Sequence, residues 1–249
     1  MRPTPGWLPA EPYEDVELGV LKTGKEAQID LVERHGDDGS TCLIARKRYL
    51  PRQVTHKGQL EAAGFQKAST FRHDVQYREG RQFRKTRDRR AVERMSTYGK
   101  LLLQERWTHH EHDTMRVLWA AGVRVPYPIG FADDAFDLEY VGDRDGVAPQ
   151  LHAARLSAAG LDDALDQLVE GLRTIVATGY AHGDLSAYNL LWWEDMLWFI
   201  DFPQAVDIAA NPTGLDFLHR DVVNVCTWFE RRGCDVDAEA LFADLLGFL

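Results

Sequence analysis

The stretch from Tyr180 to Asp207 constrains the fold more than any other part of the 249-residue chain. Its sequence is YAHGDLSAYNLLWWEDMLWFIDFPQAVD, in which the apolar runs LLWW and LWFI flank the turn segment EDM with its two acidic residues. Short aromatic and aliphatic runs on both sides of a polar turn are typical of a two-stranded hairpin. The sequence therefore predicts a loop, a strand, a turn, a second strand and a second loop.

Three polar side chains occupy the open end of this predicted hairpin. Asp184 lies in the loop before the first strand, Asn189 begins that strand, and Asp201 follows the second strand. Because a hairpin brings its two open ends together, we expect these residues to be neighbours. Asp and Asn are also common in turns and caps, which is the plain alternative for any one of them alone. Three of them around one hairpin favour a functional site.

The chemistry of these groups suits magnesium and phosphate. Carboxylate and amide oxygens suit Mg2+, which takes few protein ligands and completes its shell with phosphate and water. Phosphoryl transfer needs such a metal site and a carboxylate that orients the attacking hydroxyl. An Asp, an Asn five residues later and an Asp after the next strand form the protein-kinase pattern. The sequence thus predicts an ATP- and magnesium-dependent phosphotransferase, with Mn2+ as an alternative metal.

The N-terminal part supplies two further candidates. Gly24 and the turn HGDDGS at 35–40 divide it into three expected strands. Lys47 lies in the third, TCLIARKRYL, where a kinase places the lysine that holds nucleotide phosphates. Glu111, on a downstream predicted helix, is the candidate partner that fixes Lys47. A surface lysine and a surface glutamate are the plain alternatives.

The remaining pattern predicts an α+β, protein-kinase-like fold with two lobes. A long connection is expected over 51–80, two helices over about 89–121, a strand over 136–141, and an amphipathic helix over 161–176. Two more helices are expected at about 213–231 and 237–247. The expected domains are an irregular lead-in at 1–17, an antiparallel-sheet N-lobe at 18–141 with a flexible basic insert at about 51–95, and a larger, mostly helical C-lobe at 142–249.

Composition narrows the class of protein. The chain is 45% hydrophobic and 27% charged, as globular proteins are, and its net charge of -10 disfavours a mainly nucleic-acid-binding surface. Three cysteines without a CxxC pair predict neither a disulfide framework nor a zinc site. The three histidines at 109, 110 and 112 are expected to face solvent rather than bind zinc. With no secretory signal and no long apolar run, a cytoplasmic protein is expected.

Several motifs resemble those of the RIO family of atypical serine/threonine kinases, from about Thr23 to the C-terminus. TGKEA at 23–27 is similar to the phosphate loop of that family, and ARKRY at 45–49 to its lysine strand. LEYVG at 138–142 with APQL at 148–151 resembles its hinge. The most specific matches are HGDLSAYNLL at 182–191, which resembles the catalytic loop, and IDFPQAVD at 200–207, which resembles the metal-binding loop. Lys22 departs from the pattern, because the family usually has a small serine there.

The resemblance implies a role for each catalytic candidate. Asp184 would orient the substrate hydroxyl and accept its proton. Asn189 and Asp201 would bind magnesium. Lys47, held by Glu111, would contact phosphate oxygens.

The resemblance also implies how ATP binds and where its phosphate goes. Thr23, Gly24 and Lys25 would form the phosphate loop, and the backbones of Glu139 and Val141 would bind the adenine. The implied reaction transfers the γ-phosphate of ATP to protein serine, including serine of the protein itself. An accompanying ATPase activity is also implied.

Two other functions stay open at this point. A small-molecule kinase similar to aminoglycoside or choline kinases shares HGDL, the following Asn and a later Ile-Asp. An ATPase switch that binds RNA or a ribosome-like particle would use the basic run RQFRKTRDRRAVER at 81–94, which holds seven basic and two acidic residues. A solvated helix face is the plain explanation of that run, which could also meet the phosphates of ATP.

Overall fold

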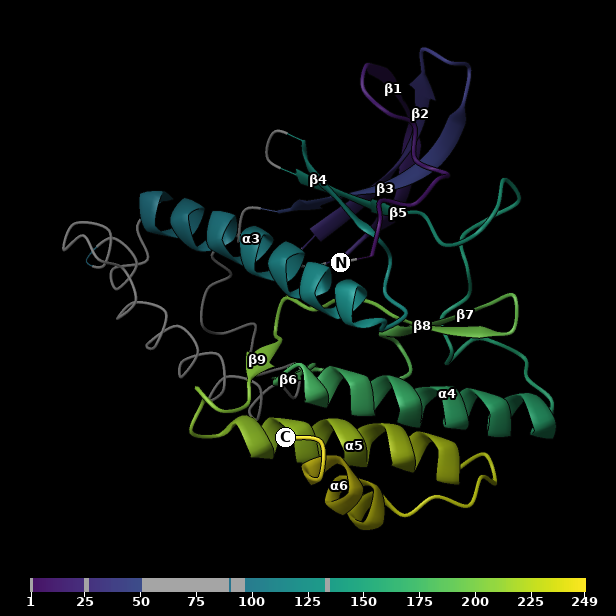
Figure 1. Ribbon diagram of the computed structural model, residues 1–249, viewed down its shortest axis with the longest axis vertical. Helices are drawn as coiled ribbons and strands as arrows, with labels where there is room; N and C mark the ends of the chain where they lie inside the picture. The colour runs from purple at the N-terminus through teal and green to yellow at the C-terminus, as the bar shows by residue number, and fades with distance from the viewer. Residues whose placement is uncertain (1, 25–26, 51–89, 91–96, 133–134) are drawn as a thin grey trace, which may run out of the picture.

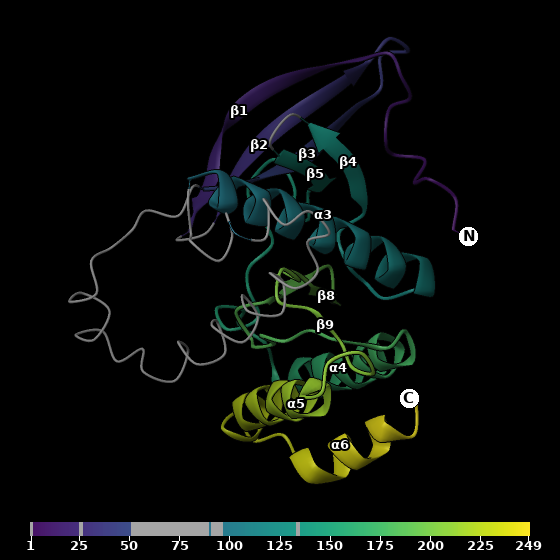
Figure 2. The same cartoon turned by 90° about the vertical axis from the view of Figure 1, so that its left-hand side faces the viewer.

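The computed structural model describes residues 2–24, 27–50, 90, 97–132 and 135–249. An antiparallel sheet forms one part, a layer of helices forms the other, and helix α3 (Thr97–Ala121) lies between them (Figures 1 and 2). The predicted two-lobe α+β arrangement is therefore confirmed. The basic insert predicted at about 51–95 lies outside the described residues, apart from Arg90.

The sheet contains five strands in the order β1-β2-β3-β5-β4. Their bounds are β1 Tyr13–Thr23, β2 Ala27–Gly36, β3 Thr41–Tyr49, β4 Pro128–Ala132 and β5 Ala135–Glu139. All neighbouring strands are antiparallel. The three N-terminal strands and the strand near 136–141 were predicted from the sequence.

Strand β1 begins inside the segment that was predicted to be irregular. Tyr13 pairs with Gly36, so the expectation of irregular structure up to residue 17 is wrong for its last five residues. The reason is a buried ion-pair network. Asp15 accepts bonds of 2.7 Å from both Arg34 and Arg46, on strands β2 and β3. An acidic edge strand held in this way does not show the apolar alternation by which strands are recognised.

The helical layer consists of α4 (Ala158–Ala177), α5 (Gly214–Glu230) and α6 (Ala238–Leu246). Ser157 caps α4 by accepting the Gly160 N–H at 3.1 Å, and Asp237 caps α6. These helices match the three that were predicted for the C-terminal half. No helix in the described part of the chain is both long and apolar enough to cross a membrane.

A hairpin and a short strand pair position the site between the two parts. Strands β7 (Leu190–Trp193) and β8 (Met196–Phe199) pair antiparallel, as predicted. Strand β6 (Tyr180–Ala181) pairs with β9 (Val206–Asp207), so the loops before and after the hairpin are held at both ends.

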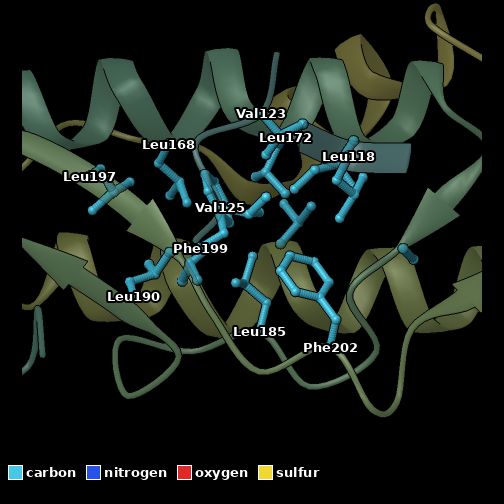
Figure 3. Packing of buried hydrophobic residues seen from close by; sticks show 14 of the residues in the cluster. Leu118, Val123, Val125, Leu168, Leu172, Leu185, Leu190, Leu197, Phe199 and Phe202 are labelled. Carbon is cyan, nitrogen blue, oxygen red and sulfur yellow. The ribbon is translucent and has the colours of Figure 1, made fainter. Parts of the chain in front are cut away.

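One apolar core joins α3, α4 and the hairpin (Figure 3). It includes Leu118 from α3, Leu168 and Leu172 from α4, and Leu190, Leu197 and Phe199 from the hairpin. Phe202, which follows the hairpin directly, is fully buried in the same core. The loops that carry Asp184 and Asp201 are thus anchored by apolar packing on either side.

Candidate active site

The hairpin brings the predicted metal ligands together. Leu190 pairs with Phe199, and just beyond them the Ile200 N–H donates to the Asn189 carbonyl at 3.0 Å. Asp201 is therefore beside Asn189 at the open end. The Asn189 Nδ2 donates to the Asp184 carbonyl at 2.8 Å. Because this bond uses Nδ2, Oδ1 is the side-chain atom of Asn189 that could take the predicted cation.

Asp201 has an unusual backbone and a strong charge partner. Its φ of 69° lies in the left-handed region, which is uncommon for residues other than glycine and is frequent at functional sites. Lys47 Nζ lies 2.6 Å from Asp201 Oδ1. Removal from bulk water alone would raise the pKa of Asp201, but the Lys47 charge and hydrogen bond outweigh this and lower it. The carboxylate is therefore ionised, as a cation ligand must be.

Lys47 and Glu111 form the predicted pair. Lys47 Nζ lies 2.7 Å from Glu111 Oε1, and the Glu111 side chain is fully buried. Glu111 Oε1 also accepts the Phe202 N–H at 3.0 Å, and Oε2 accepts the Tyr49 hydroxyl. Burial alone would lower the pKa of Lys47, but Asp201 and Glu111 raise it well above its usual value. Lys47 is therefore a charged amine held between two carboxylates.

Asp184 lies at the solvent-exposed side of the same site. Its side chain is exposed. Partial desolvation in the loop raises its pKa above the reference value of 3.8, helped by the negative charges of Asp201 and Asp221 and opposed by His182 and Arg220. A carboxylate with a raised pKa is a better proton acceptor than an ordinary one.

Residues of α5 hold the loop that carries Asp184 in place. Asp221 is fully buried, and its two carboxylate oxygens accept the N–H groups of Gly183 at 2.7 Å and Leu185 at 2.9 Å. These amides lie on both sides of Asp184. Arg220 also donates to the Gly183 carbonyl. Asp221 was not predicted from the sequence, although a carboxylate on the apolar face of a helix was a usable signal.

Gly183 fits a position that admits no side chain. Its φ is 83°, and a Cβ there would lie 2.1 Å from the Gln204 carbonyl oxygen. Beside it, His182 Nε2 lies 3.0 Å from the Ile200 carbonyl oxygen. The loop at 182–185 is thus packed directly against the loop at 200–205, which fixes Asp184 relative to Asp201.

The predicted phosphate loop is described only in part. The Gly24 N–H donates to the Ala27 carbonyl at 2.8 Å and closes the turn between β1 and β2. Thr23 pairs with Gln28, on the sheet face opposite to Lys47. Lys25 lies outside the described residues.

The predicted hinge connects the sheet to the helical layer. The Glu139 N–H donates to the Tyr127 carbonyl at 2.9 Å, and the Val141 carbonyl accepts the Ala148 N–H at 2.9 Å. Within the described residues, loop and turn hydrogen bonds use neither the Glu139 carbonyl nor the Val141 N–H. A carbonyl acceptor and an N–H donor are what the predicted adenine contact needs, and Glu139 also pairs with Ile44 in the sheet.

The three histidines that were expected to face solvent lie on α3. Among the residues that the structure describes, no group of three or more His, Cys, Asp or Glu side chains could hold a metal ion. The expectation that all three histidines face solvent is wrong, however. His112 is buried and packs on Phe131 at 4.5 Å between ring centroids, and His110 Nε2 lies 2.9 Å from the Ala205 carbonyl oxygen.

The chain is similar in sequence to proteins of one family. The sequence model of the RIO domain matches residues 65–241. The chain is 35% identical over 135 residues to the RIO-type serine/threonine-protein kinase Rio1 of Thermoplasma acidophilum, covering 54% of this chain and 69% of that protein. It is 31% identical over 229 residues to Rio1 of Haloferax volcanii, covering 92% of this chain and 68% of that protein.

Two solved structures share the fold. The Rio2 kinase of Chaetomium thermophilum matches with a TM-score of 0.62 at 19% identity, over 94% of this chain and 63% of that one. The same kinase in an ADP/Mg2+-phosphoaspartate complex matches with a TM-score of 0.58 at 18% identity, over 91% of this chain and 61% of that one. The chain thus spans about three fifths of both Rio2 chains.

Proposed function

Because the chain belongs to the RIO family of ATP-dependent serine/threonine-protein kinases, we propose that it transfers the γ-phosphate of ATP to a serine hydroxyl that Asp184 orients. The observation that carries the proposal is the meeting of Asp184, Asn189, Asp201 and Lys47 at one end of the hairpin. Serine of the protein itself is included among the proposed acceptors.

Each group has a proposed part in the transfer. Asp184 orients the attacking hydroxyl and accepts its proton, a role that its raised pKa supports. Asn189 Oδ1 and the Asp201 carboxylate would hold Mg2+, which supplies positive charge to the phosphates when bound. Lys47 holds phosphate oxygens, and Glu111 keeps its amine in place. The Glu139 carbonyl and the Val141 N–H bind the adenine edge, and Gly24 and Lys25 cover the phosphates. Thr23 takes part through its backbone, because its side chain lies on the sheet face opposite to Lys47.

A protein acceptor is favoured over the alternatives. The similar proteins are named as serine/threonine-protein kinases, which supports protein serine rather than an aminoglycoside or choline. ATP hydrolysis as a side activity stays a prediction. RNA or ribosome contact through residues 81–94 also stays a prediction, because only Arg90 of that run is described.

The domain boundaries and the cytoplasmic location are proposals as well. Cys42, Cys226 and Cys234 are free in the structure, which supports a reducing compartment. Cell fractionation with an antibody against the protein tests the location.

The test of the function uses radiolabelled ATP with magnesium, the purified wild-type protein and an Asp184→Ala variant. The matched control is Asp195→Asn, at the opposite end of the same hairpin, where the left-handed φ of 57° also suits asparagine. We expect label on serine in the wild type and the control, and none in Asp184→Ala. Parallel tubes with kanamycin and choline detect a small-molecule acceptor. Label on those compounds, or free phosphate alone, contradicts the proposal.

A further inference from the structure

Lys22, near the end of strand β1, lies in line with Lys47 across the sheet. Lys22 pairs with Ile29 on β2, and Ile29 pairs with Lys47 on β3. Directly paired residues of neighbouring strands point to the same face of a sheet. Lys22 and Lys47 therefore share one face, with their Cα atoms about 10 Å apart at the usual strand spacing.

That face is the one that looks toward the active site. Lys47 uses it to reach Glu111 on α3 and Asp201 beyond β8. The charge of Lys22 also contributes to lowering the pKa of the Asp201 carboxyl, although less than Lys47 does. The strand register thus places Lys22 on the face from which Lys47 reaches Asp201.

A bulge in β1 gives Lys22 this direction. Val20 pairs with Asp30 and Lys22 with Ile29, so β1 advances by two residues while β2 advances by one. The extra residue is Leu21. In a regular strand that kept Leu21 but had no bulge, Lys22 would share the face of Val20 and Asp30, which is opposite to the face of Lys47. Bulges beside active sites commonly re-aim a side chain in this way.

The two lysines differ in how their charges are used. Lys47 is 5% exposed and is held between two carboxylates. Lys22 is exposed, and in the described part of the chain no ion pair includes it. A flexible lysine of this kind is a mobile point charge that can follow a phosphate group.

We propose that Lys22 binds the terminal phosphate of ATP, as a second cation that acts beside Lys47. The assignment rests on the proposed function and adds a residue to it. The terminal phosphate is the one favoured, because Lys22 is exposed and lies on the edge strand β1, two strands outward from Lys47. Asp201 and Asn189 would hold Mg2+, which would supply positive charge to the phosphates. Lys22 then distinguishes ATP from ADP, whereas Lys47 serves both.

The test is calorimetric titration of MgATP, MgADP and adenosine into the wild type, Lys22→Gln and Lys22→Arg. Loss of one exposed charge-assisted contact should make Lys22→Gln bind MgATP about tenfold more weakly, which corresponds to about 1.4 kcal/mol. We expect less than about a threefold change for MgADP and no change for adenosine. Lys22→Arg should restore most of the MgATP affinity.

The matched control is Arg232→Gln, which also removes one exposed positive charge. Arg232 lies just beyond the far end of α5, about 18 Å along the helix axis from Arg220 beside the catalytic loop. We expect this variant to bind all three compounds as the wild type does.

Each result supports or overturns the assignment. Unchanged MgATP binding by Lys22→Gln, while the wild type binds MgATP, overturns it. Equal weakening for MgATP and MgADP overturns the choice of the terminal phosphate, and equal weakening for all three compounds overturns the assignment of Lys22 to a phosphate. Wild-type protein that binds adenosine but not MgATP overturns the proposed function itself, which is a different outcome from failure of the Lys22 variant alone.

Discussion

The Glu111 carboxylate offers the sharpest test of how the site is held together. It accepts three donors, Lys47 Nζ at 2.7 Å, the Phe202 N–H at 3.0 Å and the Tyr49 hydroxyl. The first two use Oε1 and the third uses Oε2. A Glu111→Gln substitution can retain both bonds at Oε1, because the amide oxygen takes that place. At Oε2 the new NH2 group can donate to the Tyr49 oxygen, which is able to accept.

Glu111→Gln therefore removes the charge and keeps the hydrogen bonds, whereas Glu111→Ala removes both. Loss of one partner of a buried ion pair costs about 3–5 kcal/mol, because the remaining groups stay buried without it. We expect a cost in that range for Glu111→Ala. For Glu111→Gln we expect about 1–2 kcal/mol, because the bonds persist and Asp201 still neutralises Lys47.

Thermal unfolding followed by circular dichroism measures the difference. For a domain of this size, about 1 kcal/mol shifts Tm by about 2–4 °C, so the alanine variant should melt about 10 °C below the wild type. The glutamine variant should lose about 5 °C or less. An equal decrease in Tm in the two variants would refute the argument, since the hydrogen bonds retained by glutamine would then add no stability. A negligible loss in the alanine variant would show that Glu111 does not hold Lys47 in solution.

Three further predictions concern the catalytic loop and its support. Gly183→Ala should abolish phosphoryl transfer in the labelling assay, because a Cβ would lie 2.1 Å from the Gln204 carbonyl oxygen; full activity would contradict this. Asp221→Asn should lower kcat and change KM for ATP little, because its amide nitrogen cannot accept one of the two backbone N–H groups that flank Asp184. The lost bond costs about 1–3 kcal/mol, and a change in KM alone would contradict this prediction. Asp184 acts as a proton acceptor only when ionised, so kcat should fall as the pH drops through its raised pKa, above 3.8, and a flat profile would contradict the assignment.

The hairpin and its polar ends could be predicted from the sequence because they are local. Asn189 and Asp201 are joined by a two-stranded hairpin, and its geometry follows from two apolar runs and a turn. The Lys47–Glu111 contact joins residues 64 positions apart, so only the kinase pattern suggested it. A contact between residues so far apart in the sequence leaves no local pattern from which it can be predicted.

The residues that the sequence did not reveal act through long-range contacts. Asp221 is 36 to 38 positions away from the amides that it holds, and Tyr49 is 62 positions from Glu111. Each of them looked ordinary in its own segment, a carboxylate in a helix and a tyrosine at the end of a strand. Arg34 and Arg46 likewise determined where β1 begins, through Asp15, and neither alternation nor turn residues carried that information.

The two carboxylates that hold Lys47 are not equivalent, and this decides which contact an entering anion displaces. Glu111 is fully buried and has two other donors, so the cost of moving it is high. The Asp201 side chain is 47% exposed, and water can replace the lysine there. A phosphate that reaches Lys47 Nζ therefore competes with Asp201 rather than with Glu111. The same event would free the Asp201 carboxylate, so that binding of phosphate at Lys47 and of a cation at Asp201 would favour each other.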